Sequence, residues 1–151
     1  MAYISGVSEY TQILQVTKAK IENMQIAQRN MHDSGIVDLD TNRLTTVLGT
    51  VASVLSFAFL QSTAGGAAIA TVGVASALAP NPKEILKDLV YEGYWNMGYI
   101  EEVFNNPKYD LVEAEFPFIE YVVDGKTIRF VMGPAAVLRV RTTDGYWEVR
   151  S

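Results

Sequence analysis

Apolar side chains in the first quarter of the chain recur at alternating intervals of four and three residues. The positions on this spacing are Tyr10, Leu14, Thr17, Ile21, Met24, Gln28 and Met31, of which Thr17 and Gln28 interrupt the apolar series. A period near 3.5 residues is that of a helix packed along a partner helix. The spacing predicts an amphipathic helix over residues 8–33. Asp33-Ser34-Gly35 is expected to end it, because glycine favours the left-handed conformation found after helices.

Residues Thr45 to Pro82 carry no charge and belong to the longest uncharged segment of the chain. It is apolar on every side from position 44 to 60, is interrupted by the sequence QSTAGG, and becomes apolar again over 67–78. Paired glycines favour a turn over a helix interior. The segment therefore predicts an apolar helical hairpin over residues 44–79, with Gly65 and Gly66 at its tip.

A further helix is predicted over residues 82–104. Asn81 suits the N-cap, Pro82 suits the first helical position, and Asn105-Asn106-Pro107 ends the segment. The expected buried stripe consists of Ile85, Leu86, Leu89, Val90, Met97, Ile100 and Phe104. The aromatic residues around Tyr94-Trp95 are expected to seal this helix onto a sheet, although a membrane interface would also suit them.

From residue 109 onward the apolar period changes to two. Asp124-Gly125 and Asp144-Gly145 separate alternating runs, which is a strong hairpin signal. The pattern predicts a four- or five-stranded antiparallel β-meander over residues 109–150. Its expected inward side chains are Ile128, Phe130, Met132, Leu138, Val140, Trp147 and Val149. The predicted fold class is α+β, with N-terminal helices followed by the sheet in a single domain spanning 1–151.

Composition narrows the range of functions. The 151 residues are 49% apolar, carry a formal charge of −5 and include no cysteine. General disorder, disulfides and an overall attraction to nucleic acid are therefore not expected. His32 is the single histidine, so no serine–histidine triad and no two-histidine metal site is predicted. No catalytic residue, metal, cofactor or small-molecule substrate is expected.

The N-terminal sequence MAYISGVSEYTQILQ lacks the basic region and the apolar run of a secretory leader. Synthesis in the cytoplasm is therefore expected, followed by membrane association or by release without a leader.

The uncharged arms are short for membrane spans, since about 20 apolar residues are needed to cross a bilayer. The arrangement TVASVLSFAFL, QSTAGG, AAIATVGVASALA nevertheless resembles the hydrophobic helical hairpin of colicin-type pore-forming domains. That resemblance covers about 35 residues in layout and composition. It implies a hairpin that is buried in water and inserts when the bundle opens. The chain departs from the colicin pattern because it is much shorter and ends in a sheet.

The first functional hypothesis is a non-enzymatic membrane-active protein. Its lipid or partner-helix contacts would be Leu48, Val51, Leu55, Phe57, Phe59, Leu60, Ile69, Val72 and Val74. The alternative is a structural or interaction protein that buries the same hairpin in a homo-oligomer or larger assembly. A metal-dependent nuclease is the third, because Asp110 followed by Asp124-Gly125-Lys126 resembles the acidic-plus-DxK pattern of restriction-type nucleases.

Four arginines are expected on the outer face of the sheet, namely Arg129, Arg139, Arg141 and Arg150. They would form cross-strand ion pairs with acidic neighbours. The alternative is a docking face for an acidic partner or a lipid headgroup.

Overall fold

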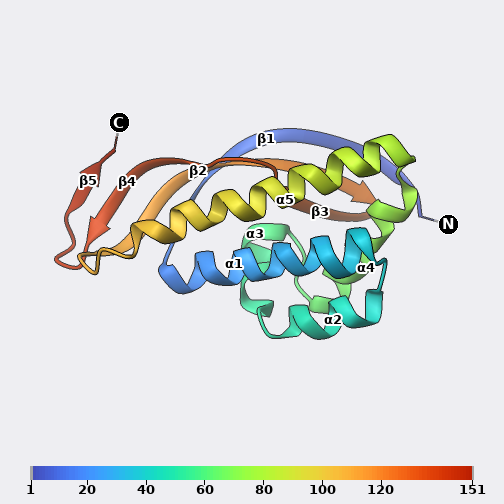
Figure 1. Cartoon of the computed structure of the whole chain (residues 1–151), viewed down its shortest axis with the longest axis horizontal. Helices are drawn as coiled ribbons and strands as arrows, with labels where there is room; N and C mark the ends of the chain where they lie inside the picture. The colour runs from blue at the N-terminus through green and yellow to red at the C-terminus, as the bar shows by residue number, and fades with distance from the viewer. Residues whose placement is uncertain (1, 151) are drawn as a thin grey trace.

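The computed structural model of the chain describes residues 2–150, in which helices lie against a long, curved antiparallel sheet (Figure 1). The helical elements are α1 (Lys18–Asn30), the π-helix η1 (Met31–Val37), α2 (Thr41–Gly49), the 3-10 helix η2 (Ala52–Val54), α3 (Leu55–Phe59), α4 (Ala64–Ala77) and α5 (Pro80–Val103). The strands are β1 (Ile4–Val16), β2 (Tyr109–Val123), β3 (Lys126–Val131), β4 (Ala136–Thr142) and β5 (Trp147–Val149). The predicted α+β class, with helices followed by an antiparallel sheet, is confirmed.

The central strand of the sheet is β2. It pairs with β1 along one side. Its other side pairs with β3, which matches Phe118 to Val131, and with β4, which matches Val112 to Val140. β3 and β4 therefore lie end to end along β2, and β5 extends the sheet beyond β4. Asp124 and Gly125 make the turn between β2 and β3 with positive φ angles of 50° and 77°, as the Asp-Gly signal predicted.

The first strand corrects the prediction of a helix over 8–33, which is wrong for residues 8–16. Tyr10, Gln12, Leu14 and Val16 alternate on one face of β1, opposite residues of β2. A spacing of four residues fits a strand face as well as a helix face, so the pattern was ambiguous. Pairing with a strand some hundred residues away decided the outcome.

The helix α1 begins after Thr17, whose hydroxyl accepts a hydrogen bond from the Lys20 backbone N–H. It does not end at Asp33-Ser34-Gly35, because the chain continues as η1. Gly35 is buried, and a Cβ there would lie within 2.8 Å of side-chain atoms of Thr71 and Leu44. This glycine therefore permits close packing of η1 against α2 and α4, and it does not serve as a helix cap.

The predicted hairpin over 44–79 is a chain of short helices. Its first arm comprises α2, η2 and α3, and Leu60 ends α3 with a positive φ of 65°. Gly65 and Gly66 are not a tip, because they form the first turn of α4, which Thr63 caps by accepting a hydrogen bond from Gly66 N–H. No helix among residues 2–150 is by itself long and apolar enough to span a bilayer. The bent pair Ala52–Phe59 and Ala64–Ala77 passes together by length and composition.

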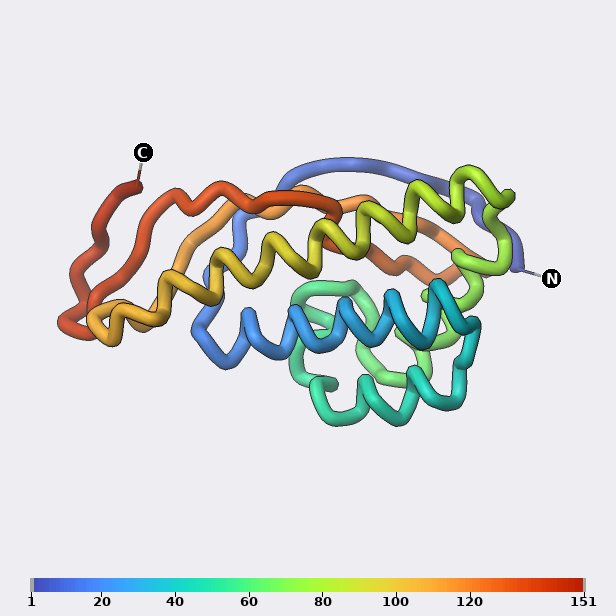
Figure 2. The backbone as a smooth tube through the Cα atoms, in the orientation of Figure 1, coloured from blue at the N-terminus to red at the C-terminus, as the bar shows by residue number. Residues whose placement is uncertain are grey.

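The longest helix is α5, which lies across the sheet beside α1, as the tube in Figure 2 also shows. It begins at Pro80, with Ala79 rather than the expected Asn81 in the N-cap position. Gly93 lies directly against the carbonyl oxygen of Val131, where no Cβ would fit. The buried apolar side chains of the helices and the sheet form one continuous cluster.

Candidate functional site

The residues predicted to contact lipid lie mostly inside the molecule. Five of the nine are buried, two are partly buried, and two are exposed. The buried ones are Leu48, Val51, Leu55, Phe59 and Val74, the partly buried ones are Phe57 and Val72, and the exposed ones are Leu60 and Ile69. Burial of this hairpin therefore requires no second chain.

Arg129 holds the uncharged segment against the sheet, contrary to its predicted place on the outer face. Its side chain is 2% exposed. Nε donates to the Ala58 carbonyl at 2.9 Å, and Nη2 donates to the Phe57 carbonyl at 3.2 Å. These carbonyls belong to the last turn of α3, where a positive charge is favoured. The guanidinium also lies 3.8 Å from the centre of the Phe118 ring.

The remaining donors of Arg129 reach β1. Nη1 donates to the Tyr10 hydroxyl at 3.1 Å and to the Gln12 side-chain oxygen. Tyr10 in turn donates to Glu120 at 2.6 Å. Burial and this hydrogen bond raise the pKa of Tyr10 above its ordinary value. The guanidinium of Arg129 is therefore held by hydrogen bonds inside the fold, is linked through Tyr10 to the Glu120 carboxylate, and is not presented to a ligand.

The other sheet arginines form cross-strand pairs. Arg139 donates to Glu113 at 2.9 Å, and Arg141 donates to Asp110 at 3.0 Å. The bond from Arg139, with a second from Gln15, holds the pKa of Glu113 below its usual range. Arg139 also lies 4.0 Å from the Trp147 ring centre, and Arg150 lies over Tyr109. Two of the four predicted docking residues are thus already paired with carboxylates.

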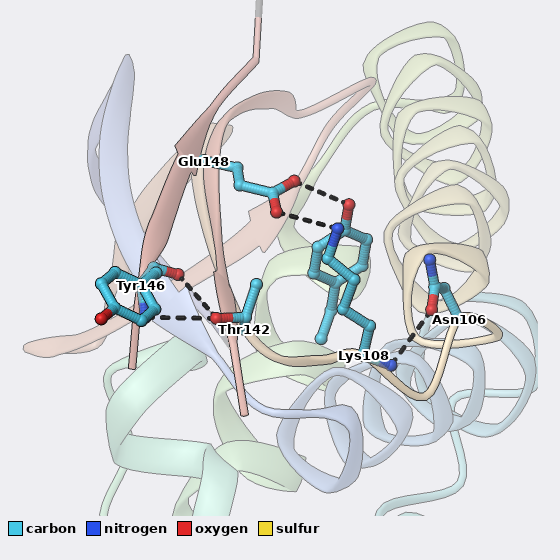
Figure 3. Close-up of polar contacts among 6 residues, drawn as sticks. Asn106, Lys108, Thr142, Tyr146 and Glu148 are labelled. Carbon is cyan, nitrogen blue, oxygen red and sulfur yellow. Dashed lines mark hydrogen bonds and ion pairs between the residues drawn. The ribbon is translucent and has the colours of Figure 1, made fainter. Parts of the chain in front are cut away.

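Polar contacts at the far end of the sheet fix β5 to the loop after α5, as Figure 3 shows. Glu148 accepts from Lys108 at 3.0 Å and from the Tyr109 hydroxyl at 2.9 Å. These bonds lower the pKa of Glu148 and raise that of Lys108. Val149, which was predicted to point inward, is 84% exposed because β5 extends past the helices that cover the sheet. The contacts of Glu148 with Lys108 and Tyr109 therefore anchor the short edge strand β5.

The nuclease pattern does not assemble into a metal site. Asp110 and Asp124 lie at opposite ends of β2, about 45 Å apart along an extended strand. Asp110 is bonded to Arg141, and Asp124 accepts a hydrogen bond from the Tyr3 backbone N–H. Among residues 2–150 no three carboxylate, histidine or cysteine side chains are grouped so that they could hold a metal ion.

The outer face of α5 carries a stripe of exposed aromatic side chains. Tyr91, Trp95 and Tyr99 recur every four residues and are 46 to 62% exposed. Asp88, one turn before Tyr91, and Glu92, directly after it, are also exposed. No lysine or arginine occurs over residues 88–102. The face is therefore both aromatic and acidic, which distinguishes it from the paired charges of the sheet.

A pocket of about 200 Å³ continues this face onto the end of α1 and the start of η1. Its walls are Arg29, His32, Asp33, Tyr91, Tyr94 and Trp95. The His32 ring lies 5.5 Å from that of Tyr91, and its Nδ1 lies 2.7 Å from an Asp33 oxygen. The volume is smaller than the roughly 300–1,000 Å³ of sites for drug-sized ligands. It suits one inserted side chain of a larger partner.

The sequence expectation for these aromatic residues was incomplete. They were expected to seal the helix onto the sheet, whereas the buried face of α5 consists of Leu86, Val90, Gly93, Met97 and Ile100, and Gly93 lies against the Val131 carbonyl of β3. The spacing of Tyr91, Trp95 and Tyr99 at i, i+4 and i+8, offset from the apolar stripe, was the available signal.

No protein-family model matches the chain, and neither curated protein sequences nor solved structures give a significant match. Function is therefore inferred from the geometry of the chain.

Proposed function

We propose that this chain is a non-enzymatic interaction protein that docks a basic polypeptide segment of another protein on the outer face of α5. The observation that carries the proposal is the stripe of Tyr91, Trp95 and Tyr99, accompanied by Asp88 and Glu92, in a part of α5 (residues 88–102) that contains no lysine or arginine. Exposed tryptophan and tyrosine are enriched where proteins bind one another.

The chemistry of the face favours a cationic partner. Aromatic faces attract guanidinium and ammonium groups, and the neighbouring carboxylates add charge complementarity. Arg29 already lies 5.9 Å from the Tyr94 ring centre at the edge of this face, which supplies an internal example of the same contact. An arginine-rich segment along α5 would repeat that arrangement at Trp95 and Tyr99.

A defined peptide tests the proposal. The chain has two tryptophans, so Trp147→Phe leaves Trp95 as the only indole reporter. Titration with a nine-residue arginine peptide is expected to change Trp95 fluorescence, and this change should weaken in high salt. A nine-residue glutamate peptide should have no effect.

Matched variants locate the binding. Tyr99→Ala is expected to weaken binding of a labelled arginine peptide at least about fivefold, whereas Tyr146→Ala, an exposed tyrosine near the far end of the sheet, should leave it unchanged. Asp88→Asn should weaken binding more than Asp144→Asn, which changes the net charge equally. Equal effects of the two tyrosine variants would show that binding is not located on α5, and equal effects of the two aspartate variants would show attraction to the overall negative charge; either result would overturn the proposal.

Membrane insertion of residues 44–79 is the second candidate, favoured by the bent helix pair that passes the length and composition test together. Insertion would have to break the contacts of Arg129 with α3. Ile69→Asp separates the two proposals, because Ile69 is 53% exposed and the fold is expected to accept a charge there. Leakage of vesicles made of equal parts phosphatidylcholine and phosphatidylglycerol, abolished by Ile69→Asp, would support insertion. Absence of leakage from the unaltered chain would exclude it.

A further inference from the structure

The strand β1 forms a long open edge of the sheet. It spans 13 residues and pairs only with β2, so it is the outermost strand on its side (Figure 1). Side chains on both faces of its middle part are exposed. Val7 and Ile13 are 56% and 51% exposed, which is unusual for β-branched apolar residues.

The peptide groups on the outer side of this edge have no hydrogen-bond partner among residues 2–150. In an antiparallel strand, alternate residues direct their N–H and C=O groups to opposite sides. No hydrogen bond found among residues 2–150 uses the side of Gly6–Leu14 that faces away from β2. Residues 4–16 contain no lysine, arginine or proline, the residues that commonly block edge pairing, and Glu9 is their only charge.

We propose that β1 binds β1 of a second copy of this chain, antiparallel and in one register. A twofold axis at Tyr10 would place each residue i opposite residue 20 − i of the second copy, so that the two paired residue numbers always add up to 20. Val7 would then face Ile13 of the second copy. Because of the twofold symmetry, this apolar pair forms twice in the dimer and covers the exposed side chains of both copies. Glu9 would face Thr11, and Tyr10 would face its own equivalent.

The neighbouring registers give less favourable side-chain pairs, and the dimer is therefore expected in this register. Directly opposite side chains in an antiparallel pair lie on the same face of the sheet. The sum of the two paired residue numbers can therefore change only in steps of two. A sum of 18 sets Glu9 against Glu9, and like charges directly opposite are destabilising. Sums of 16 and 22 set Glu9 against Val7 or Ile13 and leave the apolar pair unmatched.

The size of the contact predicts a reversible dimer. Pairing over Gly6–Leu14 would add about eight to ten hydrogen bonds along some 30 Å of edge. A strip of that length and roughly 10 Å thickness buries about 600 Å² in total, which is less than stable complexes bury. The register irregularity between Ile4 and Gly6 limits extension further.

Sedimentation velocity between roughly 10 and 500 μM, the range for such small interfaces, is the first test. The unaltered chain is expected to shift from monomer toward dimer. Ile13→Lys should reduce association at least about tenfold and still fold, because the new lysine lies opposite Glu115 of its own chain. Val149→Lys is the matched control on the other sheet edge and should dimerise normally. A monomer at every concentration, or loss of the dimer in the control alone, would overturn the proposal.

Cysteine pairing tests the register independently of stability. The chain has no cysteine, so Val7→Cys and Ile13→Cys can be introduced singly. Under mild oxidation, the mixture of the two variants is expected to form a disulfide-linked heterodimer, whereas neither variant alone should cross-link efficiently. Equal cross-linking of each variant with itself would contradict the twofold axis at Tyr10.

Discussion

The side-chain amide of Gln28 pairs with both backbone groups of Val131, as a neighbouring strand would. Its oxygen accepts from Val131 N–H at 2.9 Å, and its nitrogen donates to the Val131 carbonyl at 2.7 Å. The same nitrogen donates to the Val90 carbonyl of α5 at 2.9 Å. Gln28 is fully buried, so one polar side chain of α1 closes the free edge of β3 and links it to α5.

Gln28→Leu is expected to lower the free energy of unfolding by about 2–4 kcal/mol, because the Val131 peptide groups would stay buried without partners. Urea unfolding measures the change. Gln25→Leu is the matched control, since Gln25 is only partly buried and makes one bond, to the Tyr94 carbonyl. Its loss should be below about 1 kcal/mol. Equal losses would mean that the pairing with Val131 contributes nothing specific.

Gly93→Ala and Gly49→Ala are expected to change stability in opposite directions. A Cβ at Gly93 would overlap the Val131 carbonyl, which belongs to rigid backbone, and the cost should be about 3 kcal/mol or more. A Cβ at Gly49 meets nothing within 4 Å, and alanine there should stabilise α2 by about 0.5–1 kcal/mol. Thermal unfolding of both variants would show the difference in sign. A tolerated Gly93→Ala would disprove this close approach of α5 to β3.

Arg129→Met is expected to cost about 3 kcal/mol or more, because the α3 carbonyls and the Tyr10 hydroxyl lose their buried donor. Arg43→Met on the exposed surface of α2 makes the same chemical change and should cost less than about 0.5 kcal/mol. Denaturant unfolding compares the two. If Arg129 were instead a surface docking residue, the two variants would unfold alike.

Because the pKa of Tyr121 is raised in the folded protein, we expect the free energy of unfolding to fall at high pH. Burial, with a smaller contribution from the charge of Glu9, raises the pKa of Tyr121 to about 12. The unfolded chain releases this proton near pH 10, so the stabilisation is complete below about pH 10 and is lost as the pH rises toward 12. Tyr121→Phe should flatten the decline of the unfolding free energy above about pH 10, whereas exposed Tyr146→Phe should not. Parallel declines in both variants would refute the assignment.

Local patterns along the sequence predicted most elements near their true positions. The period of two and the two Asp-Gly bends located β2 to β5, and the prolines located the start of α5 within two residues. These signals depend on backbone preferences and on alternation over a few neighbouring residues, which are properties of the chain itself.

The incorrect predictions for residues 8–16 and for Arg129 have one physical cause. In both cases a contact with a segment distant in the sequence decides the outcome. The apolar spacing through Tyr10 and Leu14 fits both a helix and a strand, and only pairing with Phe118 and Ala114 selects the strand. Arg129 alternates with Ile128 and Phe130, so the sheet pattern places it outside. The arrival of α3 on that face buries it.

Composition and local periodicity establish the α+β class, the uncharged central segment, and the absence of cysteine and of a second histidine. Tertiary structure decided which surfaces remained open. It enclosed most of the apolar hairpin, paired Arg139 and Arg141 with carboxylates, and left the aromatic face of α5 and the edge of β1 exposed. Exposure depends on which distant segments cover a side chain, and that information is absent from local periodicity.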